Sequence, residues 1–172
     1  MNMTLTAARI FGILFLLFLA GCSHTHQFDQ NPNIGTMERT KLSGKTLAAD
    51  LSGVPEEYHD RANGHKFNIT GIRSNADIVV HKWFAKEQWV NDPAKAEYLL
   101  KLKVELQLGS AFMGTHCTAN AQWDIVRQNK IVSTGKGSDD ASIPTVQAGG
   151  SNCEIAYLKA ISTAMDDALG KM

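Results

Sequence analysis

The sequence predicts an α+β fold in which an antiparallel sheet carries amphipathic helices packed on one of its faces. Within 98–108, apolar and polar residues alternate from Leu100 to Leu108, and they alternate again at 116–125, as in strands that are buried on one side and wet on the other. Two further segments, which begin near Ser74 and Ser151, place apolar residues three and four positions apart. They predict helices that cover the buried side of the sheet.

The chain begins with the pattern of a secretory signal peptide, because Arg9 precedes the apolar run 10–19 and small residues follow it. This run is roughly half as long as a bilayer-spanning helix requires. The segment Leu19 to Cys22 (LAGC) resembles the bacterial lipobox, after which a signal peptidase cuts and leaves a lipidated cysteine as the first residue. Residues 1–21 are therefore expected to be a lipoprotein signal peptide. The alternative is an ordinary signal peptide with an incidental cysteine.

The lipobox resemblance implies a location as well as a modification. It implies three acyl chains, palmitate among them, on Cys22, and two or more chains hold a protein stably on a membrane. In enterobacterial lipoproteins an aspartate after the cysteine retains the protein at the inner membrane. Ser23 stands at that position here, so we expect a lipid-anchored protein on the periplasmic face of the outer membrane.

Charge and length restrict the remaining chain. The full sequence carries 17 basic and 17 acidic residues, and only Arg9 is charged within residues 1–21, so the mature chain has 16 − 17 = −1 net charge. This balance gives no basic face for nucleic acid and no polybasic membrane patch. The 172 − 21 = 151 remaining residues are enough for one domain with a hydrophobic core.

Two cysteines, Cys117 and Cys153, remain once Cys22 is assigned to the lipid. In an oxidising compartment an even pair predicts a disulfide bond. Two buried free thiols or a catalytic cysteine are the alternatives, although no local motif supplies the base that a nucleophile needs. The bond requires that the two Cα atoms lie within about 7 Å of each other.

Residues 22–44 are polar and lack apolar periodicity, so we expect a flexible, lipidated tether before a single periplasmic domain over 45–172. His24 and His26 form an H-T-H pair within this segment. Two ligands on a mobile tether are too few for a defined metal site, so solvated linker histidines are the favoured interpretation.

The first part of the domain shows two short strands separated by a charged loop. Segments 45–51 and 66–72 are predicted strands, and the turn formers between them indicate a loop. That loop holds His59 and His65 together with Glu56, Glu57 and Asp60. No spacing typical of a metal site orders these side chains. We therefore assign no metal ligand here.

A predicted helix follows, because 74–77 (SNAD) resembles a capping box. Its apolar side comprises Ala76, Val79, Val80, Trp83 and Phe84. Trp83, Phe84 and Trp89 could form a platform on which a ligand stacks. Aromatic residues at helical spacing are more often core residues, and the core is the preferred interpretation.

The C-terminal half contains the strongest patterns. In the strand at 116–125 Cys117 belongs to the apolar set and is expected to point inward, and a turn at 127–130 leads into a third strand at 131–136. The polar stretch 137–150 is predicted to be a mobile loop. A second capping box at 151–154 opens the last helix, whose apolar positions are Ile155, Leu158, Ile161, Met165 and Leu169. Cys153 in its first turn would then pin the helix to the sheet through Cys117.

The order of these elements over 75–169 is similar to that of a group of small bacterial outer-membrane lipoproteins, which includes accessory subunits of envelope machines. The similarity includes the A-x-Y-L-L-x-L phrase of 96–102 and the N-K-I-V turn of 129–132. It implies one antiparallel sheet with helices on one face and offers no catalytic residue. The cysteine at the start of the last helix and residues 44–66 depart from this group.

These patterns favour a membrane-anchored envelope lipoprotein that acts as a non-catalytic binding or assembly accessory subunit. The expected partners are the membrane, through the lipid on Cys22, and an envelope protein that the sequence does not identify. The expected contact surfaces are an exposed sheet edge and the segment 137–150. A protective inhibitor or immunity lipoprotein that blocks a hydrolase or toxin is the alternative. We assign no catalytic residue, no metal ligand and no cofactor.

Overall fold

The computed structural model describes residues 22–34, 40–112, 114–145 and 148–172. The predicted signal peptide and the first three lipobox positions lie outside these residues. Among the described residues, no helix is both long and apolar enough to cross a membrane. The predicted α+β class is confirmed, since the described residues form two sheets and two α-helices.

The larger sheet has the strand order β5-β2-β6-β7-β8. Its strands are β2 (Thr46–Gly53), β5 (Gln88–Trp89), β6 (Tyr98–Ala111), β7 (Gly114–Arg127) and β8 (Lys130–Ile143). The last three form an antiparallel meander, as predicted. Strand β2, however, runs parallel to both β5 and β6, so the sheet is mixed. The chain between β2 and β6 returns through a helix, which is the connection that parallel strands require.

A smaller sheet has the order β1-β4-β3 and comprises β1 (Ser23–Gln27), β3 (Glu57–Ala62) and β4 (His65–Thr70). The predicted tether over 22–44 is therefore wrong at its start, because β1 pairs in parallel with β4 and the next residue, Phe28, is only 1% exposed. The charged segment before His65 is likewise a strand rather than a loop. Asn63 and Gly64, both at positive φ, turn β3 directly into β4.

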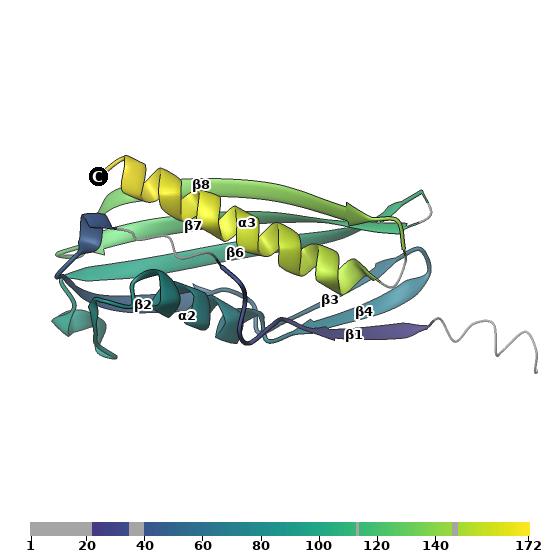
Figure 1. Cartoon of the computed structure of the whole chain (residues 1–172), viewed down its shortest axis with the longest axis horizontal. Helices are drawn as coiled ribbons and strands as arrows, with labels where there is room; N and C mark the ends of the chain where they lie inside the picture. Colours follow the sequence, from purple (N-terminus) through teal and green to yellow (C-terminus); the bar gives the residue numbers. More distant parts are fainter. Residues whose placement is uncertain (1–21, 35–39, 113, 146–147) are drawn as a thin grey trace, which may run out of the picture.

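Two α-helices, α2 (Ile72–Trp83) and α3 (Gly149–Gly170), lie on the same face of the larger sheet (Figure 1). Both predicted capping boxes are wrong, since the N-caps are Gly71 and Ala148, each three residues before the predicted serine, and neither helix has a side-chain cap. Gly71, at φ 74°, precedes α2. Two 3-10 turns complete the described structure, η1 (Thr40–Leu42) and η2 (Pro93–Lys95), and the side chain of Asp92 caps the second.

The core lies between the larger sheet and the helices. The inward positions predicted from the alternation of β6 and β7 are confirmed as buried: Leu100, Leu102, Val104, Leu108, Cys117, Ala119, Ala121, Trp123 and Ile125. The predicted face of α2 is buried as well. In α3, Ile161, Met165 and Leu169 are buried, whereas Ile155 is 51% exposed and does not belong to the core.

The predicted mobile loop at 137–150 is wrong for 137–143, because β8 continues to Ile143, and for 149–150, which begin α3. The inward positions of β8 are small rather than apolar, so the strand gives no alternating pattern. Cβ atoms added at Gly135 and Gly137 would meet the backbone of α3 at 2.0 and 2.2 Å. Glycine is therefore what allows α3 to lie directly against β8.

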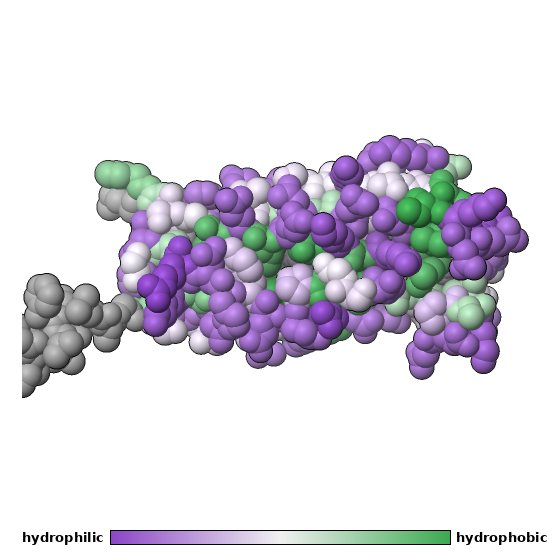
Figure 2. All heavy atoms as spheres, turned by 180° about the vertical axis from the view of Figure 1, so that it is seen from behind, coloured by the Kyte–Doolittle hydropathy of each residue, from purple (hydrophilic) through white to green (hydrophobic). Residues whose placement is uncertain are grey.

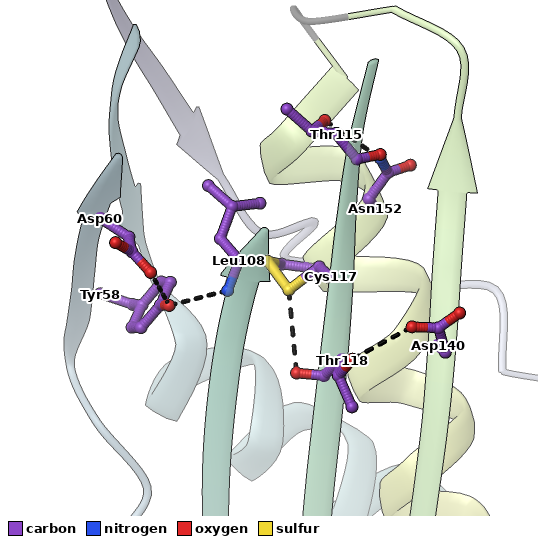
Figure 3. Close-up of a disulfide and its surroundings, with 9 residues drawn as sticks. Tyr58, Asp60, Leu108, Thr115, Cys117, Thr118, Asp140 and Asn152 are labelled. Carbon is purple, nitrogen blue, oxygen red and sulfur yellow. Dashed lines mark hydrogen bonds between the residues drawn. A yellow bond between two sulfur atoms is a disulfide. The ribbon is translucent and has the colours of Figure 1, made fainter. Parts of the chain in front are cut away.

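The structure contains the predicted disulfide bond between Cys117 of β7 and Cys153 of α3, with the Cα atoms 4.9 Å apart (Figure 3). Next to it, the buried Asn152 donates from Nδ2 to the carbonyl oxygen of Thr115 at 2.7 Å. Further along the helix, Trp123 Nε1 donates to the carbonyl oxygen of Ile161 at 3.1 Å. These contacts attach α3 to β7 at several points along the helix.

The smaller sheet closes over the N-terminal part of α3. His26 of β1 lies 2.8 Å from Glu154, whose other carboxylate oxygen accepts the backbone N–H of Asp29 at 2.5 Å. Phe28 packs on Tyr157, with ring centroids 5.1 Å apart. Burial is the main reason that the pKa of Tyr157 is raised, and the charge of Glu154 adds to it. The N-terminal strand is thus an integral part of the domain.

Candidate functional site

Three apolar side chains form a row across the face of the larger sheet that no described helix covers (the uncovered face), near the end that carries the β7–β8 turn. Leu99 of β6 pairs with Val126 of β7, which pairs with Ile131 of β8. Leu99 directly precedes the buried Leu100, and Val126 directly follows the buried Ile125. Successive side chains of a strand point to opposite faces, so Leu99 and Val126 point away from the core. Ile131 is 62% exposed.

A register shift in the β7–β8 pairing adds Val132 to this row. Ile125 pairs with Ser133, whereas Val126 pairs with Ile131, so Val132 has no partner on β7. Such a bulge at a sheet edge redirects a side chain, and Val132 is 45% exposed. We call Leu99, Val126, Ile131 and Val132 the hairpin-end surface.

A hollow of about 530 Å³ lies beside this surface. Leu99 and Val126 line it, together with Pro93 of η2 and the turn residues Gln128 and Asn129. Both turn residues have positive φ, 50° and 61°, as a tight two-residue hairpin turn requires. The turn and η2 thus form the walls of a recess with apolar residues in it.

Charged residues border the recess. Arg127 donates from Nη2 to Glu97 Oε1 at 2.9 Å, and its guanidinium carbon lies 5.3 Å from the centre of the Tyr98 ring. The same carboxylate oxygen accepts from Lys45 at 3.2 Å. Figure 2, seen from the side away from α3, shows hydrophobic side chains gathered at this end among hydrophilic ones. An apolar centre with a polar rim containing arginine is typical of protein interfaces.

The rest of the uncovered face is polar and largely bonded to itself. Lys103 and Glu105 form an ion pair at 2.8 Å beside a second hollow of about 490 Å³, and the hydrogen bond between them lowers the pKa of Glu105. Thr134 donates to Asp124 at 2.6 Å. These side chains already have partners, so this area offers fewer unused groups than the hairpin-end surface.

The sequence predicts an exposed sheet edge without indicating which strand forms it; the edges of the larger sheet are β5 and β8, and α3 covers part of β8. The backbone N–H of Lys136 donates to Asp167 at 3.0 Å, and Lys171 donates to the carbonyl oxygen of Thr134 at 3.1 Å. Helix side chains therefore occupy the middle of the edge where a partner strand would bind. The unpaired bulge at Val132 interrupts the register of β8 with β7 near the start of the strand.

The remaining candidate residues are scattered. Cys22 is exposed at the start of β1, and its carbonyl oxygen accepts the N–H of Lys66 at 3.0 Å. His24 and His26 are not linker residues, because His24 lies 2.9 Å from His65 and His26 contacts Glu154. His59 pairs with Glu57 on the exposed side of β3. Across the part of the chain that the structure describes, no three His, Cys, Asp or Glu side chains gather as metal ligands would.

The aromatic residues considered as a stacking platform separate into two groups. Trp83 and Phe84 are 5% and 1% exposed and belong to the core, as the preferred interpretation expected. Trp89 is only partly buried, and its ring lies 4.0 Å from that of His81. The three aromatic side chains do not form one open surface.

No protein-family model matches the chain, and no curated protein is similar to it in sequence. Protein XCC0632 from Xanthomonas campestris, of the family DUF330, is similar in structure: the TM-score is 0.58 at 12% identity, over 88% of this chain and 97% of that one. This likeness shows a shared fold alone. The LpoB C-terminal domain from Salmonella enterica covers 59% of this chain and 86% of its own length at 13% identity, but a TM-score of 0.28 supports no argument.

The hairpin-end surface was not predicted, although the sequence contains one signal for it. Ile131 and Val132 are adjacent apolar residues just after the turn, and the pairs 99–100 and 125–126 at the facing ends of β6 and β7 are apolar as well, so the alternation breaks at this end of all three strands. Adjacent positions of a regular strand point to opposite faces. Two apolar neighbours before a polar strand therefore indicate either a bulge or an exposed apolar residue, and this chain has both.

Proposed function

We propose that this protein is a membrane-anchored envelope lipoprotein that acts as a non-catalytic binding or assembly accessory subunit, held by acyl chains on Cys22 at the periplasmic face of the outer membrane. A partner protein of the envelope binds the hairpin-end surface. The observation that carries the proposal is the row Leu99, Val126 and Ile131, with the bulged Val132 beside it, at the end of the domain away from Cys22.

The position of this surface supports the proposal. Cys22 lies at the start of β1, next to the β3–β4 turn, whereas the β7–β8 turn is at the other end of the long strands (Figure 1). A lipid on Cys22 would hold one end of the domain at the membrane and leave the hairpin-end surface accessible. The recess beside it, with Arg127 on its border, has room for an aromatic or aliphatic side chain of a partner.

The partner is tested by crosslinking in intact cells. A photo-crosslinking amino acid at Ile131 should capture an envelope protein, and Val132→Asp in the same protein should abolish the product because a charge would be desolvated in the interface. The same amino acid at Ile155, which is 51% exposed on α3, is the matched control. Equal products from both positions, or none from either, would count against this surface. Capture of a toxin or hydrolase would instead favour the protective role.

The anchor is tested separately with Cys22→Ser. We expect the variant to stay uncleaved or to become soluble, and in both cases to leave the outer-membrane fraction, because the acyl chains supply its attachment. Normal retention in that fraction would refute the lipoprotein assignment. The crosslinking result at Ile131 would still report on partner binding.

A further inference from the structure

Three segments meet at the end of the domain that carries Cys22. The first is Cys22 itself, whose carbonyl oxygen accepts the N–H of Lys66. The second is the β3–β4 turn, where Asn63 donates its backbone N–H to Ser110 Oγ at 2.8 Å and its side-chain amide to the carbonyl oxygen of Gly114. The third is the β6–β7 turn, which joins those two strands and carries Phe112. Together they form what we call the lipid-end surface (Figure 1).

Phe112 projects from this surface into solvent. It is 94% exposed, the highest value among the exposed large hydrophobic residues of the described chain. Ala111 pairs with Gly114, so Phe112 lies in the turn itself. A solvated phenylalanine at a hairpin tip contributes nothing to the core, but phenylalanine, like tryptophan and leucine, is typical of the apolar side chains that interfacial proteins bury at the boundary between headgroups and acyl chains.

Two basic side chains lie next to the β3–β4 turn at the same end of the domain. Arg61 of β3 and Lys66 of β4 are direct cross-strand partners, a placement in which like charges repel. Within the described residues, no carboxylate forms an ion pair with either side chain. Both line a hollow of about 350 Å³ together with Ser23, the residue that follows Cys22. Asp60 also lines this hollow, but its carboxylate accepts hydrogen bonds from the hydroxyl of Tyr58 at 2.5 Å and from the backbone N–H of Arg61.

The distance between lipid and domain is short, because Ser23 already pairs with Lys66 in the sheet. Acyl chains on Cys22 would therefore hold Phe112, Arg61 and Lys66 permanently near the headgroups, and this restriction raises their effective concentration there. A polar tether would have allowed the domain to turn freely. Because β1 starts at the residue that follows Cys22, the lipid cannot give the domain this freedom.

We propose that the lipid-end surface is a second membrane contact: Phe112 inserts into the boundary region of the bilayer, and Arg61 and Lys66 bind the phosphates of anionic phospholipids. This inference rests on the proposed lipidation of Cys22. It adds that the domain stands on the membrane in one orientation rather than hanging from a flexible anchor.

The test uses the full chain, purified with its lipid and placed in nanodiscs of phosphatidylcholine with or without phosphatidylglycerol. An environment-sensitive dye is attached at Phe112→Cys, and Ile131→Cys at the opposite end is the matched control. Cys117 and Cys153 are bonded to each other and Cys22 carries its lipid on sulfur, so the dye reacts at the introduced thiol. Quenchers on the lipid chains report contact, and the mass of the mature protein reports acylation.

For the acylated protein we expect blue-shifted emission and quenching at position 112 and neither at position 131. Arg61→Gln with Lys66→Gln should reduce the quenching at position 112 in discs that contain phosphatidylglycerol and leave it unchanged in pure phosphatidylcholine. If an acylated protein in discs gives the same unquenched emission at both positions, the docking inference is overturned while the anchor stands. If the mature protein carries no acyl chain, the proposed anchor is overturned, and the docking inference with it.

Discussion

Replacement of Gly135 by alanine tests how closely α3 lies on the sheet. An added Cβ would be 2.0 Å from the carbonyl oxygen of Ala164 and 2.2 Å from the backbone nitrogen of Ala168, whereas ordinary contact begins at 3.4 Å. The helix would therefore have to retreat by 3.4 − 2.0 = 1.4 Å. Because both obstructing atoms belong to the backbone, no change of rotamer can relieve the clash.

The magnitude follows from the contacts that such a movement breaks. Inserting a methyl group into a packed interface costs about 2 kcal/mol. Ser133 Oγ donates to the carbonyl oxygen of Ala168 at 2.5 Å and Trp123 Nε1 to that of Ile161 at 3.1 Å, both across the same interface. Each such bond contributes about 1 kcal/mol net. We therefore expect Gly135→Ala to lower the free energy of unfolding by about 4 kcal/mol, a large part of the 5–15 kcal/mol typical of a domain.

The assay is urea unfolding of the mature chain from residue 22, with Cys22→Ser, followed by circular dichroism. Gly170→Ala is the matched control, because Gly170 ends the same helix and has no atom within 4 Å of its added Cβ. Alanine there should change the free energy of unfolding by about 1 kcal/mol or less. An unchanged urea midpoint for Gly135→Ala would refute the close contact between α3 and β8.

Three further predictions concern the disulfide, a tyrosine and the N-terminal strand. The Cys117–Cys153 bond spans 36 positions, and its reduction should lower the free energy of unfolding by about 4 kcal/mol, because the unfolded chain gains entropy. Urea unfolding with and without reductant measures this change. Equal midpoints would contradict the prediction. Burial, helped by the hydrogen bond to Asp60, raises the pKa of Tyr58 to about 12. Because the unfolded side chain ionises near pH 10, this stabilisation should be complete below pH 10 and disappear as the pH rises to 12; Tyr58→Phe should show a weaker loss of stability over that range. Glu154→Gln should speed hydrogen exchange in Ser23–Gln27 and leave β7 unchanged, because Glu154 accepts bonds from His26 and Asp29; exchange as slow as in the parent protein would show that β1 is held without them.

The parts of the fold that the sequence predicts are those in which one face is apolar and the other polar. In β6 and β7 large apolar side chains recur at every second position, so their direction and the inward position of Cys117 follow from the sequence. The inward positions of β8 include Ser133, Gly135 and Gly137. Small residues fill these positions because the backbone of α3 occupies the space. The absence of apolar residues therefore reflects close packing rather than a loop.

The predicted strand at 66–72 is confirmed as β4 (His65–Thr70), but its two neighbours in the smaller sheet, β1 and β3, were not predicted, for two different reasons. Strand β1 is short and turns His24 and His26 toward the core side, and their partners lie on β4 and α3, far away in the sequence. A single sequence contains no pattern for such parallel, long-range pairing. The β3–β4 hairpin, by contrast, has an Asn63-Gly64 turn, which is a strong hairpin signal. The hairpin was nevertheless not predicted, because β3 consists mostly of charged and polar residues and has too few apolar residues to show the alternation of a strand.

The strand immediately after Cys22 changes what a lipid anchor would do in this protein. Strands β6 and β7 each have 14 residues, and at a rise of about 3.3 Å per residue they separate the two ends of the domain by roughly 45 Å. A flexible tether of the predicted kind would let either end approach the membrane. With β1 paired to β4 from Ser23 onward, an acyl chain on Cys22 would keep Phe112 at the bilayer and the hairpin-end surface on the far side. The proposed partner contact and the proposed membrane contact can then be made at the same time by one rigid domain, which is the arrangement that an accessory subunit between a membrane and an envelope protein needs.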